Sequence, residues 1–493
     1  MYLLGYDIGS SSIKAALVDA QTGEQLAVAQ SPATEMEMLA VQSGWAEQHP
    51  ETWWSNACLA TQKLLQLTQI DPSRIKGIGI AYQMHGLVLV DENQEVLRPS
   101  IIWCDSRAVA IGDKAAEEIG REKCLQHLLN APGNFTASKL KWVKDNEPDL
   151  YERIHKIMLP GDYIAMRLTG EIRTTASGLS EGILWDFQEN TPAALVMDYY
   201  GFDENLLPEL VDTFSLQGAV TTAAAKATGL SSGIPVNYRA GDQPNNALSL
   251  NVLAAGEVAA TGGTSGVVYG VVDRPLYDPA SRVNGFAHVN HTREAPRIGI
   301  LLCINGAGIQ YSWVKQHMAE QGLGYPEMEK LAAAIPPGAD GLRILPFGNG
   351  AERMLENKAP GARINNLQFN RHHRAHFYRA ALEGVAFSFV YGTGILQEMG
   401  LDLQVMRVGN DNLFQSGIFA STISNLLGSR IEVLETTGAI GAAKAAGVAV
   451  GIYSSIREAM TGNKLVTAYE PSKTKDSYQE AYQQWYSDLK MIL

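Results

Sequence analysis

The sequence contains two stretches of the same design, YDIGSSSIK at residues 6–14 and GEVAATGGTSGVVYGV at residues 256–271. In each stretch, a turn rich in glycine, serine or threonine separates two apolar runs, which is the pattern of a β-hairpin with a polar turn. The N–H groups and hydroxyls of such a turn can converge on an anion. One polar turn alone is more often an ordinary hairpin. Two of them, one near the start of each half, could hold a polyphosphate between two domains.

The length of the chain also indicates more than one domain. Its 493 residues exceed what a single hydrophobic core usually organises. The hairpin strands are followed by helical patterns, so we predict an α/β fold in which helices cover mixed sheets. These helical patterns lie at residues 50–69, 376–396, 412–428 and 438–451. A boundary near the second hairpin divides the chain into residues 1–249 and residues 250–493.

The composition argues against several classes of protein. The net charge of −13 and the pI of about 5.3 disfavour nucleic acid or an anionic membrane as the main partner. The four cysteines are scattered without a C-x-x-C pair, so neither a zinc site nor a disulfide framework is expected. The first residues lack a signal-peptide pattern, and no run reaches the ~18 apolar residues of a membrane helix. We therefore expect a soluble, cytoplasmic protein.

Two common phosphate-binding motifs are absent from the sequence. There is no G-x-x-x-x-G-K-[ST], which excludes a P-loop. No G-x-G-x-x-G opens a helix after the first strand, which counts against a dinucleotide-binding Rossmann domain. The polar hairpin turns therefore need a different fold to explain them.

Single residues near the turns could carry chemistry. Asp7, at the end of the first strand, suits a Mg²⁺ ion that accompanies phosphate. Asp242, close to the domain boundary, could accept the proton of an attacking hydroxyl. His85 could hydrogen-bond to a polyol, and Trp103 could give a sugar an apolar face. Each also has an ordinary interpretation, namely a Gly-Asp turn for Asp242, a surface histidine for His85 and a core aromatic for Trp103.

The chain resembles the FGGY carbohydrate kinases over nearly its whole length, and among them the xylulokinases. The stretches that carry the resemblance occur in the family's order and read YDIGSSSIK, GWAEQHPETWW, YQMHGLVLVD, IIWCDSRA, APGNFTASKLKWV, LPGDYIAMRLTGE, AGDQPNNA, TGGTSG and RAALEGVAF. GWAEQHPETWW, QMHG and PGNFTASKL favour the xylulokinases over the glycerol kinases. The resemblance implies an actin-like ATPase fold, in which two ribonuclease H-like domains enclose ATP in a deep interdomain cleft.

The resemblance also implies roles for individual residues. Asp242 would be the catalytic base, and Asp7 and Asp242 would belong to the Mg²⁺ site. The sugar pocket would contain Met84, His85, Trp103, Asp105, Asn134 and Gln243. ATP would be held by a first phosphate loop at Ser10, Ser11 and Ser12, by a second at Gly263 and Thr264, by Gly306 and Gln310 beside the nucleotide, and by the adenine-site residues Gly409, Asn410 and Ser416.

The implied reaction is transfer of the γ-phosphate of ATP to a ketopentose, with the 5-hydroxyl of D-xylulose expected as the acceptor. Another ketose or polyol (L-xylulose, ribulose or glycerol) is an alternative acceptor, although Met84 and His85 stand where glycerol kinases carry Arg-Glu. A non-catalytic sugar sensor of the same fold is a more distant alternative, and the presence of both Asp7 and Asp242 argues against it. The family also leads us to expect a homodimer.

Two stretches depart from the family's pattern. Gly409-Asn410-Asp411 stands in place of the usual Gly-Gly-Gly/Ala turn near the adenine. TTASGLS at residues 174–180 lacks the aspartate that many relatives carry after the second threonine. These departures bear on nucleotide and sugar preference rather than on the phosphoryl-transfer residues.

Overall fold

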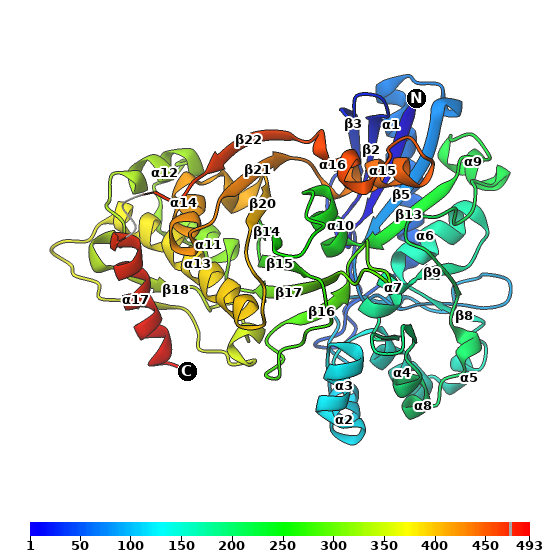
Figure 1. The fold of residues 1–493 in the computed structure, drawn as a ribbon, viewed down its shortest axis with the longest axis horizontal. Helices are drawn as coiled ribbons and strands as arrows, with labels where there is room; N and C mark the ends of the chain where they lie inside the picture. Colours follow the sequence, from blue (N-terminus) through cyan, green and yellow to red (C-terminus); the bar gives the residue numbers. More distant parts are fainter. Residues whose placement is uncertain (473–475) are drawn as a thin grey trace.

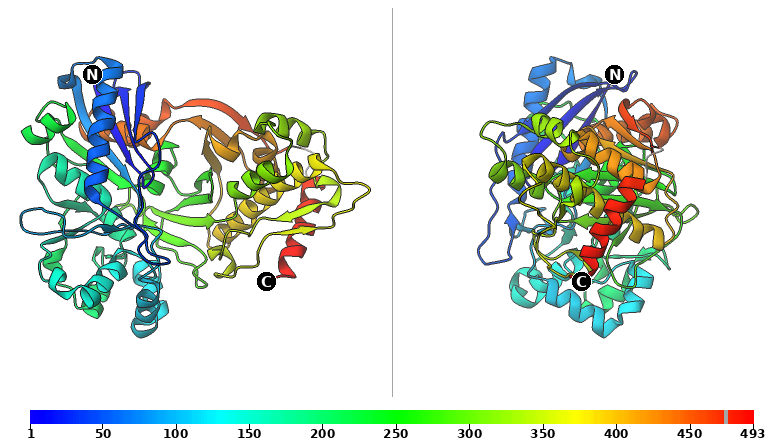
Figure 2. Two further views of the ribbon diagram at one scale, coloured as in Figure 1. Left: turned by 180° about the vertical axis from the view of Figure 1, so that it is seen from behind. Right: turned by 90° about the vertical axis from the view of Figure 1, so that its left-hand side faces the viewer.

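The computed structural model describes residues 1–472 and 476–493 and contains two large β-sheets, each flanked by helices (Figure 1). The first sheet has five strands and the second has seven. The sheets lie next to each other along the long axis of the molecule, and the two chain termini lie in different halves (Figures 1 and 2).

The first sheet combines an antiparallel meander with two later parallel strands. Its order is β13-β5-β1-β2-β3. The first three strands in the chain pair antiparallel, β5 joins β1 in parallel, and β13 joins β5 in parallel. The strands are β1 (Tyr2–Ile8), β2 (Ile13–Asp19), β3 (Gln25–Ser31), β5 (Ile75–Tyr82) and β13 (Val236–Gly241). The first predicted hairpin is thus β1–β2, with the serine turn at its tip.

The second sheet repeats this design and extends it at both edges. Its order is β16-β17-β15-β14-β20-β21-β22. The strands β14, β15 and β17 pair antiparallel, and β20 and β21 follow in parallel on the other side of β14. The bounds are β14 (Glu257–Gly262), β15 (Gly266–Val272), β16 (Asn284–Ala287), β17 (Ile298–Ile304), β20 (Val405–Gly409), β21 (Ile431–Glu435) and β22 (Lys464–Tyr469). The second predicted hairpin is β14–β15.

The repeat places equivalent helices after equivalent strands. A long helix connects the third and fourth strands of each repeat, α1 (Pro50–Thr68) in the first and α13 (Arg374–Glu398) in the second. Another helix follows the fifth strand directly, α10 (Asp242–Ser249) in the first and α15 (Gly438–Ala449) in the second. The predicted helices are confirmed, since α1, α13, α14 (Gly417–Leu427) and α15 occupy the four helical patterns.

The helices that end the two repeats pack on the opposite sheet. α15 lies on β1 and β5 of the first sheet, whereas α10 contacts β14 and β15 of the second (Figure 1). The α15–sheet contact is close because both strands carry a glycine beneath the helix. A Cβ at Gly5 would lie 1.9 Å from the Ala439 carbonyl oxygen, and a Cβ at Gly79 would lie 1.9 Å from that of Ala442. The two helices also meet each other, at Gly441 and Ser249.

The predicted division of the chain at residues 249 and 250 falls between α10 and β14. α15 belongs to the second repeat but packs on the first sheet. A division of the chain at one position therefore leaves α15 in a different part from the sheet that it covers. The two-domain division therefore stays a prediction.

The remaining elements surround the two sheets. Between β5 and β13 the chain forms a helical lobe with α2 (Val109–Ile119), α3 (Arg121–Leu128), α4 (Thr136–Asn146), α5 (Pro148–Tyr151), α6 (Pro160–Thr169), α7 (Ala176–Glu181), α8 (Ala194–Tyr200) and α9 (Thr222–Thr228). Its short strands are β6 (Val88–Val90), β7 (Ser100–Ile101), β8 (Lys156–Met158), β9 (Arg173–Thr175), β10 (Trp185–Asp186), β11 (Thr191–Pro192) and β12 (Glu209–Val211), and β4 (Glu47–Gln48) pairs with β7. The second half adds α11 (Gly308–Met318), α12 (Tyr325–Ala333), α16 (Ile456–Thr461), α17 (Asp476–Lys490), β18 (Arg343–Leu345) and β19 (Arg363–Asn365).

None of the helices in residues 1–472 and 476–493 combines the length and the apolar character that crossing a bilayer requires.

The glycine contact under α15 predicts a strong effect of one methyl group. Gly79→Ala should lower the free energy of unfolding by about 1–3 kcal/mol or more, because a backbone carbonyl of α15 occupies the position of the new Cβ. Chemical denaturation of the variant and the wild type measures this difference.

Gly394→Ala is the matched control for this prediction. Gly394 lies within α13 and has open space where its Cβ would stand, so alanine should be neutral or stabilise by up to ~1 kcal/mol. Equal stability of the Gly79→Ala and Gly394→Ala variants would contradict the proposed contact.

Candidate active site

A cavity of about 390 Å³ opens where the three parallel strands of the first sheet end. Its wall includes Asp7 near the end of β1, Gln83 just after β5, and Asp242 just after β13. Parallel strands bring their carboxyl ends to one edge of the sheet, which explains why these distant residues meet. The residues predicted from the sequence that line this cavity are Asp7, Ser10, Ser11, Ser12, Trp103, Asp242 and Gln243.

The serine turn is fixed by hydrogen bonds to its carbonyl oxygens. The Gly9 N–H donates to the Ser12 carbonyl at 3.2 Å, the Met36 N–H donates to that of Ser11 at 2.8 Å, and the Gln48 side-chain amide donates to that of Ser10 at 2.7 Å. With these acceptors occupied, the turn can offer hydroxyls and N–H groups to an anion in the cavity. The structure therefore gives the turn the chemistry expected of a phosphate loop.

Two carboxylates in the cavity lack a neighbouring cation strong enough to offset their burial. Burial raises the pKa of Asp7, and Lys14 only partly opposes this effect. Burial and the charge of Asp7 together raise the pKa of Asp242 from 3.8 to about 7. The start of α15 crowds the same place, because a Cβ at Gly438 would lie 3.2 Å from Oδ2 of Asp7. Asp242 is thus poised to exchange a proton near neutral pH.

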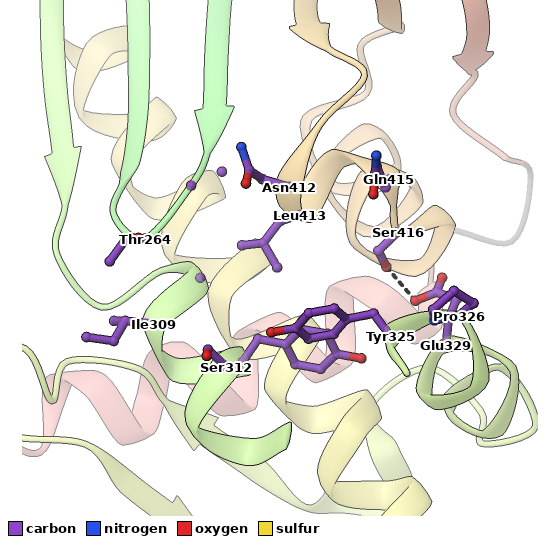
Figure 3. Close-up of a pocket in the computed structure, with 14 residues that line it drawn as sticks. Thr264, Ile309, Ser312, Tyr325, Pro326, Glu329, Asn412, Leu413, Gln415 and Ser416 are labelled. Atoms are coloured by element: carbon purple, nitrogen blue, oxygen red, sulfur yellow. Dashed lines mark hydrogen bonds between the residues drawn. The ribbon is translucent and has the colours of Figure 1, made fainter. Parts of the chain in front are cut away.

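A second, larger cavity of about 710 Å³ lies in the other half of the molecule (Figure 3). The rings of Tyr311 and Tyr325 stack on its floor, with centroids 5.4 Å apart. Ser416, at the start of α14, donates a hydrogen bond of 2.7 Å to Glu329 of α12, which ties two walls together (Figure 3). The aromatic floor and the polar rim suit a flat heterocycle.

The β14–β15 turn separates the two cavities. Thr261 faces the smaller cavity, whereas Gly263 and Thr264 line the larger one. The first N–H groups of α11 dock on this turn, since Gly308 donates to the Gly263 carbonyl and Ile309 to that of Thr264, each at 3.0 Å. A chain of phosphates that links the two cavities would therefore pass this turn and the serine turn.

Met84 and His85 follow Gln83, which lines the smaller cavity, but they are not among the described residues that line it. Met84 is buried beside Gly241, the residue that precedes Asp242. His85 has a left-handed φ of 61° and is held by its Nδ1, which donates to the Glu181 carbonyl at 2.8 Å. The Lys139 ammonium donates to the His85 carbonyl at 2.9 Å. Burial lowers the pKa of His85 to about 3, so its ring is neutral and its Nε2 is an acceptor.

Asp105 and Asn134 do not line the smaller cavity, and their place in the sugar pocket stays a prediction. The Asp105 side chain is 0% exposed and forms an ion pair with Arg107, and it accepts the Ala46 N–H at 2.6 Å. Asn134 donates its side-chain amide to the Asp105 carbonyl oxygen. Buried and paired, Asp105 supports the segment that carries Trp103, which is 51% exposed at the cavity.

The predicted nucleotide residues divide into two groups. Gly263, Thr264 and Ser416 line the larger cavity, but Gly306, Gln310, Gly409 and Asn410 do not line either of the two cavities within the described part of the chain. Gly306 instead allows the close approach of the Pro346 carbonyl, 1.8 Å from its potential Cβ, and the Asn410 side chain binds Glu435 at 3.1 Å. Their neighbours Gly308, Ile309, Ser312, Asn412 and Gln415 line the larger cavity instead, and the nucleotide role of these four residues stays a prediction.

Several residues of the larger cavity were not found from the sequence. Tyr325 and Glu329 lie on α12, a helix of nine residues that carries no recognisable motif. A proline after Tyr325 marks the helix start, but nothing local indicates that α12 faces α14. Gln83 was also missed, although it stands directly before the predicted Met84 and His85.

Comparison with protein families identifies the chain. The model of the N-terminal domain of the FGGY family of carbohydrate kinases matches residues 2–249, and the model of the C-terminal domain of this family matches residues 258–450. The chain belongs to the FGGY family of carbohydrate kinases. It is therefore a carbohydrate kinase, with ATP and a sugar as the expected class of substrates, and the resemblance seen in the sequence is confirmed.

Relatives of this FGGY kinase match it from end to end. A xylulose kinase of Bacillus subtilis is 28% identical over 93% of this chain and 90% of its own length. A xylulose kinase of Staphylococcus epidermidis is 30% identical over 99% of this chain and 96% of its own length. The crystal structure of a xylulose kinase from Rhodospirillum rubrum superposes with a TM-score of 0.88 at 26% identity, covering 100% of this chain and 99% of that one. This likeness confirms the predicted actin-like fold.

The raised pKa of Asp242 predicts how stability depends on pH. Between pH 4 and pH 7 the folded protein holds a proton on Asp242 that the unfolded chain releases, so this residue makes the fold less stable as pH rises through that window. Asp242→Asn removes the effect. In metal-free buffer at pH 8 the variant should be more stable than wild type by about 2–4 kcal/mol. The upper figure corresponds to a pKa difference of about three units, and screening of the charge by solvent lowers it.

Urea denaturation at pH 4.5 and pH 8 tests this prediction. The gain in stability should be small at pH 4.5, where Asp242 is protonated in the folded wild type. A gain of the same size at both pH values would show that packing, and not charge, separates the two proteins.

Proposed function

We propose that this kinase transfers the γ-phosphate of ATP to a ketopentose, with D-xylulose as the preferred acceptor and its 5-hydroxyl as the nucleophile. The observation that carries the proposal is Asp242, a carboxylate with a pKa of about 7 in a cavity that meets a nucleotide-sized cavity at the β14–β15 turn. The relatives named as xylulose kinases support the choice of acceptor.

Asp242 acts as the base in this proposal. A hydroxyl placed beside its carboxylate gives up a proton to it as the hydroxyl oxygen attacks the γ-phosphorus in line, and the bond from the γ-phosphorus to the bridging oxygen breaks, so that ADP leaves. The carboxylate then releases the proton to solvent after transfer. Positioning of the two substrates supplies most of the remaining acceleration.

The two polar turns hold the phosphates. The serine turn approaches them from the first sheet, and the β14–β15 turn with the start of α11 approaches from the second. Donors fixed in this way stabilise charge without reorganisation during the reaction. Because the turns belong to different halves, closure of the cleft brings them together and excludes water, which competes with the sugar as nucleophile.

The carboxylates of Asp7 and Asp242 fit a Mg²⁺ ion that enters with ATP. Both line one cavity, and desolvation together with the charge of Asp7 raises the pKa of Asp242. Mg²⁺ is usually held by one or two carboxylates together with phosphate oxygens. When bound, the ion neutralises charge on the phosphates. Asp7 is the primary ligand in this proposal, with Asp242 contributing beside its role as base.

Met84, His85, Trp103 and Gln243 form the sugar-binding wall in this proposal. Trp103 offers a half-exposed aromatic face, and its indole N–H lies 3.4 Å from the Ser10 hydroxyl. His85 offers a neutral acceptor in a fixed orientation. An apolar face with a few directed polar groups is the usual design of a sugar pocket.

We also propose a cytoplasmic location and a homodimer. All four cysteines are free, which supports a reducing compartment. The homodimer is supported by the family resemblance, and light scattering of the purified chain tests it.

Coupled ADP release tests the proposed reaction. Wild type with ATP and Mg²⁺ is assayed on D-xylulose, L-xylulose, D-ribulose, L-ribulose and glycerol, and D-xylulose should give the highest kcat/KM. Asp242→Ala should fold and bind ATP but lose about 10²–10⁴-fold in sugar-dependent turnover, because the base is missing. Near-full turnover of this variant would contradict the assignment of Asp242, and a flat response of wild type across the panel would contradict the reaction.

The Mg²⁺ assignment predicts a selective loss in Asp7→Asn. In calorimetric titrations of the ADP complex, the affinity for Mg²⁺ should fall at least about tenfold, while ADP alone binds as in wild type. Asp19→Asn, at the opposite end of the same hairpin, is the control and should leave both affinities unchanged. Unchanged Mg²⁺ affinity in Asp7→Asn would exclude Asp7 as a ligand.

A further inference from the structure

Glu181 is a buried carboxyl group without a charged partner. It is the last residue of α7, it is 1% exposed, and its Oε1 lacks a well-placed hydrogen-bond donor within the described residues, although the Tyr82 hydroxyl lies beside the carboxyl. No ion pair to Glu181 is found among residues 1–472 and 476–493. Burial and the charge of Asp242 raise its pKa well above the usual value. A group of this kind costs free energy in the folded protein unless a ligand uses it.

The carboxyl of Glu181 lies where the sugar pocket is expected. Its Oε2 is 2.3 Å from the position of a Cβ on Gly241, the residue before Asp242. The Met84 Cγ is 2.7 Å from the same position. The backbone carbonyl of Glu181 holds Nδ1 of His85. Glu181 therefore adjoins Asp242, Met84 and His85, which come from two separate segments of the chain.

Neighbouring polar groups are also left without partners. Both side-chain polar atoms of Gln83 are buried and make no hydrogen bond within the described part of the chain, and the Tyr82 hydroxyl has only the Glu181 carboxyl beside it among the described residues. Gly241 pairs with Tyr82 across β13 and β5, and Gln83 lines the smaller cavity. Native proteins satisfy nearly all buried polar groups, and clusters of exceptions mark functional sites. The cluster matches an acceptor with several hydroxyls.

We propose that Glu181 binds a hydroxyl of the sugar and takes part in the choice between epimeric ketoses, an inference that rests on the proposed function. A buried carboxyl group held in one position presents its oxygens to one side of the pocket, and epimers differ in the direction of one hydroxyl. A site that is built to hydrogen-bond a hydroxyl discriminates strongly against a molecule that leaves the site's group unpaired. The Glu181 side chain makes no hydrogen bond within α7. The contact between α7 and His85 is made by the backbone carbonyl of Glu181, which accepts a hydrogen bond from Nδ1 of His85.

Glu181→Met separates this role from a structural one. Methionine has similar length, removes the buried polar group and keeps the backbone carbonyl that holds His85. We expect the thermal midpoint of unfolding to equal or exceed that of wild type, because an unpaired buried polar group is removed. The KM for D-xylulose should rise at least about tenfold, and the preference between D-xylulose and its epimer D-ribulose should become smaller. The KM for ATP should not change. A structural carboxyl would give the opposite pattern, with a lower midpoint and an unchanged sugar KM.

Two further variants complete the test. Asp186→Asn, five residues along the chain, removes a carboxylate that binds His127 and the N–H groups of Gln188 and Glu189, and it should lower stability without changing either KM. If Glu181→Met does not fold, Glu181→Gln tests the sugar-binding role instead. Glutamine replaces one carboxyl oxygen with an NH₂ donor, so the preference between the epimers should change. An unchanged sugar KM and epimer preference in the folded variants overturn the inference while the wild-type reaction stands. Absence of ketose turnover in wild type overturns both proposals.

Discussion

The close contact of α15 with the first sheet is the constraint on which the rest of the structure depends. Gly5 and Gly79 carry no side chain, so the alanine-rich helix approaches their strands until backbone meets backbone. This contact ties the end of the second repeat to the first sheet. It also brings Gly438, at the start of α15, to the carboxylate of Asp7. The geometry of the cavity therefore follows from the packing of a helix that begins almost 200 residues after Asp242.

The site concentrates negative charge that the fold does not neutralise. Glu181 is buried and Asp7 and Asp242 are partly buried in one region, and removal from solvent raises the pKa of each. Other buried carboxylates in the described residues have partners: Asp105 is paired with Arg107 and Asp162 with Arg239, and Glu352 accepts two backbone N–H groups. In the proposed function, the partners of Asp7, Asp242 and Glu181 are the substrates and Mg²⁺.

Local patterns were enough to predict the hairpins, the helices and the two carboxylates at the strand ends, Asp7 and Asp242. A polar turn between two apolar runs, and an aspartate at the end of an apolar run, can both be recognised from a few neighbouring residues. Ser416 and the β14–β15 turn, which the resemblance named, line the larger cavity. Asp105 and Gly306 do not line either cavity: the partner of Asp105, Arg107, can be recognised only in the folded lobe, and the neighbour of Gly306, Pro346, lies 40 residues away in the chain. Glu329 and Glu181 have no local signal, because tertiary packing alone decides what they face.

The β14–β15 turn, with Thr261 on one cavity and Gly263 and Thr264 on the other, makes the two cavities share a wall. A ligand that shifts this wall in one cavity reshapes the other, so occupancy of the two cavities is thermodynamically linked. Linkage is reciprocal, and whatever factor the sugar applies to the affinity for nucleotide, the nucleotide applies to the affinity for sugar. A hairpin tip of four residues, Gly262–Ser265 in the chain, thus gives the kinase a means to favour the ternary complex over either binary one.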